Sequence, residues 1–466
     1  MSKLFGDLMT NHLGQHAVVI GGSIAGLMTA RVLAQHFTTV TVIERDRIDR
    51  HPALHKSIPQ GNHLHAILSG GQQVMATLYP GFLTKLDKLG SVRCRAGEQF
   101  VVYLPSGKAY TLSGSVREPR DLGIDSYCQS RGLLEYCVRQ CTLENTNIRF
   151  WSDCFVDKLI SHRSHVEGVR CRNDLGSDDL FADLVIDAGG RGSHARRWLA
   201  DLGFEVPSET TIGVDFAYSS TKFRIPQDYD RCERLIAVTG PPPDFPDGGI
   251  MEIIEDDIWH VTLAGRFGNY PPRDEAGFFG YAKALPTTKI HDLIKHAERI
   301  SDITSYRFPT SVWRHYERLQ AFPEGFLVIG DAIASFNPFY GQGMSSAALQ
   351  VKALQELLGE RAADGCGLAG LGLSFFPRAA EVVANPWILA ANLDLAFPQT
   401  QGERPPNFRE ALFYFRAVDA LAADDVNVQR LMVEVAGLCR PLSVLNEEPL
   451  RSRALARLDK DAHFPG

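Results

Sequence analysis

The chain has 466 residues, of which 44% are apolar and 22% charged, and its formal net charge at pH 7 is −7. These fractions exclude a disordered, collagen-like or coiled-coil chain, and the length predicts more than one structural unit. Because the net charge is negative and the sequence contains no lysine- or arginine-rich block, we expect no nucleic-acid partner.

The cysteines and the hydropathy of the chain bear on its cellular location. The nine cysteines include no CxxC pair and are odd in number, so they indicate neither a disulfide framework nor a zinc ribbon. No basic segment followed by an apolar run opens the sequence, and no window reaches roughly 18 uninterrupted apolar residues. We therefore expect reduced thiols, no integral membrane segment and a cytoplasmic location.

The N-terminal segment predicts a strand, a helix and a second strand. Apolar and β-branched residues fill 16–20 and 39–43, and apolar residues recur at helical spacing over 24–37. This βαβ pattern is typical of a parallel sheet in a doubly wound, Rossmann-like α/β domain. Two later runs that end in glycine, 184–188 and 326–329, are expected to add strands to the same sheet.

The turn between the first strand and the helix approximates the dinucleotide-binding fingerprint GxGxxG, with Ser23 at the middle glycine position. The helix that follows offers amide donors to a pyrophosphate, and Glu44 can accept hydrogen bonds from a ribose. A glycine turn without a ligand is the alternative. A second such pattern, 365–370, follows a helical stretch rather than a strand, so one dinucleotide site is expected. Its predicted contacts are Gly21, Gly22, Ser23, Ala25, Gly26, Glu44 and Arg45.

Between about 210 and 265 apolar residues alternate with polar ones, and no helical pattern intervenes. This predicts a largely antiparallel sheet that interrupts the α/β segments. From about 345 onward helical spacing dominates. We therefore expect a discontinuous nucleotide-binding domain, an inserted β-rich substrate domain and a helical C-terminal region, assigned to 1–70, 115–200 and 305–360, to 71–114 and 201–304, and to 361–466.

A glycine- and proline-containing loop lies between the strand expected at 326–329 and a long helical pattern. It contains Gly330-Asp331-Ala332 and the run from Ser335 to Met344. A loop that opens a helix in this way points amide donors at a group in front of it. The residues expected to contact a cofactor here are Asp331, Pro338, Gly341, Gln342, Gly343 and Met344. For Asp331 alone, helix capping is the alternative.

Together, this loop and the fingerprint resemble the flavoprotein aromatic hydroxylases of the para-hydroxybenzoate hydroxylase type. The resemblance implies non-covalent FAD, with Asp331 on the ribityl chain and the amides of 341–344 near the negative charge of the reduced flavin. Arg131 opens a helical pattern as the FAD-contacting arginine of that family does, although a solvated helix-start arginine is the alternative.

The segment from Ala182 to Arg196 resembles the middle motif of the same family. Gly190, Ser193 and Arg196 match that motif, but Gly189 stands where an aspartate is usual. Since the motif is associated with both FAD and NAD(P)H, the expected electron donor is NADPH or NADH held transiently, or a separate flavin reductase.

Three further segments resemble the bacterial flavin epoxidases of polyether biosynthesis: 58–65, Arg307–Thr310, and Asn385–Trp387 with Asp394 and Pro398. This resemblance implies an apolar, natural-product-like small-molecule substrate that receives one oxygen atom from O2 by epoxidation or hydroxylation, through a C4a-hydroperoxyflavin. The histidines of the first segment and its surroundings could alternatively suggest a metal site, but no cysteine or acidic ligand joins them at a usual spacing, so no metal is expected. These histidines are His51, His55, His63 and His65.

The flavin would carry the chemistry, so no catalytic side chain is predicted, and GxSxG, HExxH and P-loop patterns do not occur. The predicted substrate-wall residues of the inserted sheet, which could equally be core residues, are Phe216, Tyr218, Trp259 and Val261. The alternatives to a monooxygenase are an FAD-bound non-redox cyclase, an FAD-dependent dehydrogenase and a flavin halogenase. The WxWxIP signature of the tryptophan-type halogenases is absent.

Overall fold

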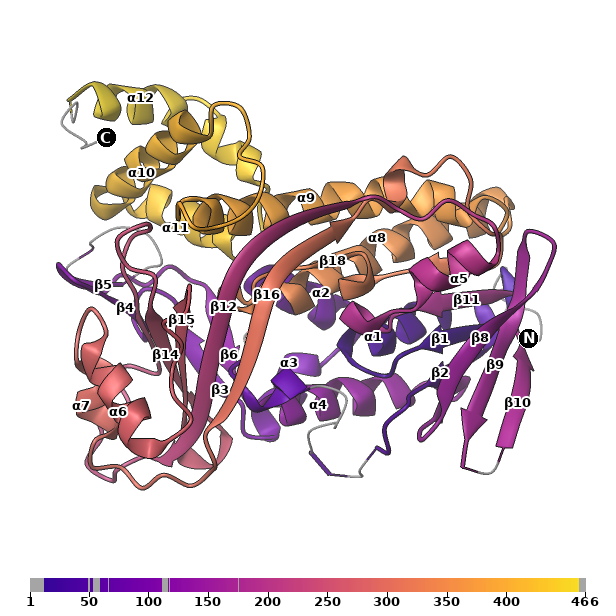
Figure 1. Cartoon of the computed structure of the whole chain (residues 1–466), viewed down its shortest axis with the longest axis horizontal. Coiled ribbons are helices and arrows are strands. Elements are labelled where there is room, and N and C mark those ends of the chain that lie inside the picture. The colour runs from indigo at the N-terminus through magenta and orange to yellow at the C-terminus, as the bar shows by residue number, and fades with distance from the viewer. Residues whose placement is uncertain are drawn as a thin grey trace, which may run out of the picture.

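The computed structural model describes residues 12–48, 51–52, 59–65, 67–110, 116, 118–174 and 176–460. Two large sheets form the body of the molecule. Figure 1 shows a parallel sheet on the right and a mixed sheet on the left, and two long strands of the mixed sheet cross the centre of the molecule. His55 and the first residue of the segment 58–65 lie outside the described residues.

The first sheet has five strands, which are β1 (Gly14–Ile20), β2 (Phe37–Ile43), β7 (Ile148–Trp151), β11 (Leu184–Asp187) and β17 (Phe326–Val328). They are all parallel and lie in the order β17-β11-β1-β2-β7. Ala17 lies opposite Leu184 on one side and Val40 on the other. The centres of these strands are buried, which explains their continuous apolar runs. The strands expected in this sheet are therefore confirmed.

Helices cover this sheet, and they are α1 (Ile24–Leu33), α2 (Ser69–Leu78), α3 (Phe82–Lys88), α4 (Arg131–Leu143), α5 (Ala195–Asp201) and α8 (Gly343–Asp364). α1 is buried along most of its length because α4 and α8 both pack against it. α2 packs against α8, and α3 packs against α4. A three-stranded antiparallel sheet adjoins this layer and consists of β8 (Phe155–His162), β9 (His165–Asn173) and β10 (Gly176–Phe181).

The mixed sheet has eight strands, which are β4 (Phe100–Leu104), β5 (Gly107–Ala109), β12 (Glu209–Arg224), β13 (Leu235–Val238), β14 (Gly248–Ile254), β15 (Ile258–Arg266), β16 (Thr304–Arg314) and β18 (Ala334–Ser335). Their order is β18-β16-β12-β15-β14-β13-β4-β5, and every pair except β13–β4 is antiparallel. The antiparallel sheet expected between 210 and 265 is therefore confirmed.

One face of the mixed sheet is covered by α6 (Glu275–Ala284) and α7 (Lys289–Ile294). These helices lie at the outer left of Figure 1. The other face looks toward the parallel-sheet layer. A short two-stranded sheet, β3 (Val92–Arg95) with β6 (Asp125–Cys128), lies on that side, and β6 touches β14. One face of the mixed sheet therefore packs in a core with α6 and α7, and its other face is directed toward the parallel-sheet domain.

Two segments pack differently from the domain division expected from the sequence. Within 71–114, α2 and α3 pack on the helices of the parallel sheet, whereas β4 and β5 join the mixed sheet. β16 pairs along β12, so residues 304–314 belong to the mixed sheet rather than to the domain assigned to 305–360. Periodicity identifies an element, but it does not say in which layer that element packs.

The C-terminal helices are α9 (Leu371–Leu395), α10 (Phe408–Asp424), α11 (Val426–Ala436) and α12 (Leu450–Lys460). α9 packs along α8, while α10 to α12 enclose a small core of their own that includes Val418, Met432 and Ala454. In Figure 1 these last three helices, in yellow, lie above the left part of the molecule. The expected helical C-terminal region is confirmed.

Short 3-10 turns join these elements, and they are η1 (Pro59–Asn62), η2 (Gly190–Gly192), η3 (Glu255–Asp257), η4 (Tyr316–Arg318), η5 (Gly330–Ala332), η6 (Pro338–Tyr340) and η7 (Leu442–Asn446). None of the helices in the described ranges combines the length and the hydropathy that crossing a bilayer requires.

Candidate functional site

The turn after β1 has the shape that its glycines predict. Gly21 adopts φ +101°, and a Cβ atom there would lie 2.7 Å from the carbonyl oxygen of Ala188. A Cβ atom at Gly26 would overlap the carbonyl oxygen of Gly21. Ala25 packs closely on Gly330, where a Cβ atom would lie 3.1 Å from its side chain. The turn, α1 and the segment after β17 therefore meet with almost no space between their backbones.

Glu44 lies directly after β2 and holds the same turn. Its Oε2 accepts a hydrogen bond from the amide of Gly22 (2.8 Å), and its Oε1 accepts one from the amide of Asp46 (2.9 Å). The residue is buried, whereas the neighbouring Arg45 is exposed. Each carboxylate oxygen has a second lone pair, so Glu44 can still accept a hydrogen bond from a ribose at this position.

Arg131 pairs with the buried carboxylate of Glu135 and contacts the glycine turn after β1. At the start of α4, its Nη2 lies 3.0 Å from Oε2 of Glu135 and donates to Oγ of Ser23 (2.6 Å), while its Nη1 donates to Sδ of Met344 (2.7 Å). Ser23 in turn donates to Oε2 of Glu135 (2.9 Å). Arg131 is only 8% exposed, so the alternative of a solvated helix-start arginine is wrong. Sequence reasoning missed Glu135, although its place four residues after Arg131 on a helix was a usable signal.

Asp331 lies in η5, with its carboxylate toward the start of α8. A Cβ atom at Gly343 would lie 3.6 Å from Oδ1 of Asp331. Burial raises the pKa of Asp331, while the nearby charges of Arg191, Arg131 and Arg314 lower it. Within the described ranges no side chain or amide donates a hydrogen bond to this carboxylate. A half-buried carboxylate with unused lone pairs can accept hydrogen bonds from the hydroxyl groups of a ligand.

The first turn of α8 supplies backbone donors beside Asp331. Gly341 adopts φ +65°, and Gln342 caps the helix and is buried. The amide of Ser346 makes the first bond of the helix, to the carbonyl oxygen of Gln342 (2.8 Å). The amides of residues 343–345 therefore precede the helical ladder and carry the partial positive charge of the helix start. Pro338, by contrast, is exposed.

These segments converge at one edge of the parallel sheet. α8 packs on α1 and on η5, and η5 packs on η2, all at the carboxyl ends of β1, β11 and β17. Ligands of open α/β sheets bind outside these strand ends. We call this group of residues the cradle, and it comprises Gly21, Gly22, Ser23, Gly26, Glu44, Arg131, Asp331, Gln342, Gly343 and Met344.

The loop after β11 contains a carboxylate, although not at the expected position. Asp187 is 1% exposed; its Oδ1 accepts from the amide of Gly189 (2.7 Å), and its Oδ2 accepts from Oγ of Ser193 (2.7 Å). A Cβ atom at Gly189 would lie 2.8 Å from Oδ1 of Asp187. Gly189 has φ −71°, and the positive φ belongs to Gly190. An aspartate at 189 would therefore require the Asp187 side chain to shift from the position in which it accepts its two hydrogen bonds.

Arg191 follows in the same loop. Its guanidinium lies 4.2 Å from the centre of the Phe308 ring, and its Nη2 donates weakly to the carbonyl oxygen of Thr310 (3.4 Å). Nη1 is buried and has no hydrogen-bond partner in the described part of the chain. This arginine connects the loop after β11 with the mixed sheet, next to Asp331.

The four predicted substrate-wall residues lie on two different faces of the mixed sheet. On β12 and β15, Phe216 lies opposite Arg266 and Tyr218 opposite Ala264, and the Phe216 ring packs on Phe339 of η6, 5.6 Å away. Trp259 and Val261 fall on the alternate positions of β15. They join the core formed with α6 and α7, so their assignment as substrate-facing residues is wrong.

A buried ion pair ties the cradle loop to the mixed sheet. Nη1 of Arg266 lies 2.8 Å from Oδ1 of Asp394 on α9, and the same carboxylate oxygen accepts from Oη of Tyr340 (2.7 Å) and from Nδ2 of Asn337 (3.0 Å). Arg266 and Asp394 are both buried. Breaking such a pair leaves an uncompensated buried charge, so this contact holds η6 in register with the sheet.

Three of the histidines suggested as an alternative metal site, His51, His63 and His65, lie in the described part of the chain. His51 is exposed, His63 is buried and His65 is half-buried, and desolvation lowers the pKa of His63 to about 4 and that of His65 to about 3. His65 donates from Nδ1 to the carbonyl oxygen of His63 (2.8 Å). Over the described ranges no group of three His, Cys, Asp or Glu side chains could hold a metal ion.

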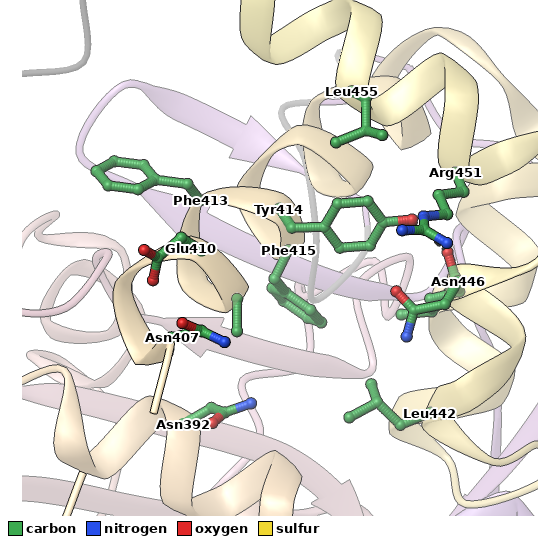
Figure 2. A pocket seen from close by; sticks show the side chains of 12 residues that line it. Asn392, Asn407, Glu410, Phe413, Tyr414, Phe415, Leu442, Asn446, Arg451 and Leu455 are labelled. Atoms are coloured by element: carbon green, nitrogen blue, oxygen red, sulfur yellow. Dashed lines mark hydrogen bonds between the residues drawn. The ribbon is translucent and has the colours of Figure 1, made fainter. Parts of the chain in front are cut away.

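A separate groove of about 960 Å³ lies in the C-terminal region, between α9, α10, η7 and α12 (Figure 2). Figure 2 shows the phenol of Tyr414 extended toward Arg451, with Leu455 beyond them. None of the predicted cofactor or substrate residues lines this groove. It is therefore distinct from the cradle.

Comparison with known proteins places the chain among characterised folds. No family model matches it. Protein Rv3254 of Mycobacterium tuberculosis is 30% identical over 459 residues, which cover 96% of this chain and 95% of that protein. Squalene epoxidase 2, mitochondrial, of Arabidopsis thaliana is 24% identical over 444 residues, covering 93% of this chain and 68% of that protein.

Solved structures share the fold at low sequence identity. The flavin-dependent brominase Bmp2 has a TM-score of 0.67 and 14% identity, covering 97% of this chain and 100% of its own. A flavoprotein/dehydrogenase from Cytophaga hutchinsonii has a TM-score of 0.66 and 13% identity, covering 96% and 98%. The p-nitrophenol 4-monooxygenase PnpA from Pseudomonas putida has a TM-score of 0.60 and 17% identity, covering 91% and 98%.

These likenesses confirm the expected α/β fold, in which a doubly wound nucleotide-type domain carries a β-rich unit and a helical C-terminal region. The sequence match extends over nearly the whole length of both chains for one relative. The chain therefore belongs to the same family as protein Rv3254 of Mycobacterium tuberculosis.

Proposed function

We propose that the protein is an FAD-dependent monooxygenase that binds its flavin non-covalently in the cradle. The observation that carries this proposal is the half-buried Asp331 carboxylate, which faces the start of α8 and has no hydrogen-bond donor among the described residues. The glycine turn and Arg131 suit a pyrophosphate, and Glu44 suits a ribose. Flavin-dependent proteins among the structural neighbours support the same cofactor.

The residues present suit the pyrophosphate, the ribose and the ribityl chain of FAD, and the negative charge of its reduced ring. The turn at Gly21 leaves no room for a Cβ atom, and the amides of residues 24–26 precede the first intrahelical hydrogen bond of α1, from Leu27 to Ser23. Asp331 can accept from the hydroxyls of a ribityl chain, and the amides of 343–345 can stabilise negative charge on a reduced ring. The bound flavin would supply the electron transfer and the activation of O2.

The tasks left to the chain are to orient the substrate and to exclude water. Phe216 and Phe339 form an aromatic contact between the mixed sheet and the cradle loop, and Arg266 with Asp394 fixes that loop. A buried aromatic surface beside the cofactor keeps water from the reacting groups. An apolar small-molecule substrate would lie against this face of the sheet.

The proposed reaction consumes substrate, O2, NAD(P)H and a proton, and it yields oxygenated substrate, NAD(P)+ and water. One oxygen atom of O2 enters an alkene or an electron-rich aromatic carbon, and the other leaves as water.

Since only one dinucleotide fingerprint occurs, NADPH or NADH would bind transiently, or a separate flavin reductase would deliver the electrons. Anaerobic stopped-flow reduction without substrate should therefore be slow and poorly saturable, and rapid saturating reduction by NADPH alone would contradict this part of the proposal.

The cofactor is tested first. Purified protein should be yellow, and denaturation should release one FAD per chain. Folded protein that stays colourless after incubation with FAD would contradict the proposal.

The reaction is tested with NADPH or NADH, isotopically heavy O2 and candidate polyketide or terpenoid precursors, and mass spectrometry should detect products that contain one heavy oxygen atom.

Halogenation is the second candidate, favoured by the TM-score of 0.67 to a flavin-dependent brominase. Adding bromide or chloride to the same assay separates the two reactions, because a halogenase product would gain halogen isotope peaks and no heavy oxygen. Product formation without O2 or an electron donor would instead indicate a non-redox cyclase. Oxidation of the substrate without oxygen incorporation would indicate a dehydrogenase.

A further inference from the structure

Three rings form a triangle on the cradle-facing side of the mixed sheet. Tyr218 of β12 lies opposite Tyr306 of β16, with ring centres 5.7 Å apart. His63, which follows η1, packs edge-on against Tyr218 at 4.4 Å and lies 6.3 Å from Tyr306. Two strands and a separate loop segment thus bring three polar aromatic side chains into contact.

The hydrogen bonds behind His63 decide which of its nitrogens carries the proton. Nδ1 lies 2.7 Å from Oγ of Ser220, and that oxygen lies 2.6 Å from Oγ1 of Thr262. Thr262 Oγ1 also accepts weakly from an amide, that of Leu64 (3.4 Å). Each hydroxyl has one proton to donate. Both protons find acceptors only if Thr262 donates to Ser220 and Ser220 donates to Nδ1 of His63.

This order places the proton of the neutral imidazole on Nε2, because Nδ1 is the acceptor. Burial lowers the pKa of His63 to about 4, so the ring is neutral near pH 7. His63 is 2% exposed, and its Nε2 has no hydrogen-bond partner in the described part of the chain. A buried N–H donor without an acceptor is costly and calls for a ligand.

The two tyrosines add further unused polar atoms. Their hydroxyl groups make no hydrogen bond with any described residue. Burial raises the pKa of Tyr218, so this side chain remains a neutral phenol. The ring contacts therefore bring one imidazole N–H and two phenol hydroxyl groups to the same part of the sheet, where Ala264 and Gly248 pair beside Tyr218.

The triangle is connected with the cradle through aromatic contacts. Tyr218 packs against Phe216 at 5.7 Å, and Phe216 packs against Phe339 of η6 at 5.6 Å. η6 leads directly into α8, whose first amides belong to the cradle. A molecule held by His63 would thus lie on the same face of the sheet as the expected reaction centre.

We infer that His63, Tyr218 and Tyr306 form a subsite for an oxygen-bearing group of the substrate, in which Nε2 of His63 donates a hydrogen bond to a carbonyl or hydroxyl oxygen. The substrate is then an apolar molecule with at least one oxygen function, and not a pure hydrocarbon. The word substrate here rests on the proposed oxygenase function, whereas the binding preference itself does not.

The test compares two probes that share one bicyclic skeleton, 1-tetralone with a carbonyl group and tetralin without it. Binding to the full-length protein, with the flavin it carries, is measured by fluorescence titration and by calorimetry. We expect 1-tetralone to bind about 10-fold more tightly than tetralin, since the carbonyl satisfies a buried donor. His63→Phe should reduce this ratio to below about 3-fold, and His63→Gln, which keeps a donor, should restore part of it.

Trp259→Phe on the opposite face of the sheet is the matched control and should leave the ratio unchanged. If His63→Phe does not fold, Tyr218→Phe and Tyr306→Phe serve instead, and at least one of them should lower the ratio. Equal binding of the two probes, absence of binding by either, or a ratio that survives in all three variants would overturn the inference. Folded protein that takes up no added FAD but retains the preference would refute the proposed function and leave the inference standing.

Discussion

One face of the mixed sheet packs against α6 and α7, and the other face looks toward the cradle. The first places Trp259, Val261 and Phe223 in a core with the apolar residues of those helices. The second carries Ser220, Thr262 and Arg266 among its aromatic residues, with several polar atoms that lack partners within the described ranges. Burying polar groups costs free energy unless they are satisfied. The contrast indicates that one face stabilises the fold and that the other is maintained for ligands.

Trp259→Ala tests the stabilising face and should have the largest effect. Trp259 is 1% exposed, and its removal leaves a cavity among well-packed side chains. We expect the free energy of unfolding to fall by about 3–5 kcal/mol, as measured by urea denaturation. The FAD affinity of the folded fraction should stay the same, because the residue faces away from the cradle. A loss of FAD affinity without a loss of stability would reverse our assignment of the two faces.

Glu252→Gln tests the polar face through its pH dependence. Burial raises the pKa of Glu252 from 4.5 to about 8, and His260 lies 3.9 Å away. The folded state retains this proton at pH values where the unfolded state has released it. The contribution of Glu252 to stability is thus fully present below about pH 4.5 and declines by ~1.4 kcal/mol per pH unit until it is lost at about pH 8.

Glutamine cannot ionise, so the variant lacks this decline. The difference in free energy of unfolding, variant minus unmodified protein, should rise by about 3 kcal/mol between pH 5.5 and pH 7.5. Urea denaturation at several pH values measures the difference. Glu298→Gln, at a side chain that is 66% exposed, is the matched control for the loss of a carboxylate. A constant difference for Glu252→Gln would mean that the carboxyl is ionised in the folded state.

Asp331→Ala removes the cradle's unused carboxylate. Its hydrogen bonds to flavin hydroxyls would be charge-assisted and worth roughly 1.5–3 kcal/mol, so the FAD dissociation constant should rise about 10- to 150-fold in a titration. The stability of the FAD-free protein should not fall, because burial already disfavours this carboxylate. An unchanged FAD affinity would show that Asp331 has been misassigned.

Tyr306→Phe should change the free energy of unfolding least. Tyr281→Phe, which removes a hydroxyl group that makes a hydrogen bond, is the comparison. Tyr306 uses its hydroxyl in no hydrogen bond with the described residues, whereas Tyr281 of α6 donates to the carbonyl oxygen of Ala264 (3.0 Å). We expect losses of unfolding free energy below about 0.5 kcal/mol for Tyr306→Phe and of about 1 kcal/mol for Tyr281→Phe. Equal losses would remove the contrast between the two faces.

Much of the nucleotide-type domain could be predicted from local sequence patterns. The βαβ unit, the glycine turn and the loop around Asp331 each depend on residues close together in the chain, whose spacing reports strand, turn and helix directly. Gly21 adopts a positive φ in the tight turn between β1 and α1, a conformation that glycine takes without steric cost. The converging position of these segments also follows, because parallel strands present their carboxyl ends at one edge.

Only the tertiary structure shows on which face of the mixed sheet each side chain lies. Alternation alone shows that Trp259 and Val261 share a face, but the register of β15 on β12 puts that face away from Phe216. His63 and Glu135 likewise depend on hydrogen-bond partners distant in the chain, Ser220 and Ser23. The close approach of the Asp187 side chain to position 189 also appears only in the folded loop. The sequence by itself determined the elements and the cradle loops, because their signals are local, whereas strand register and burial arise only when the elements pack together.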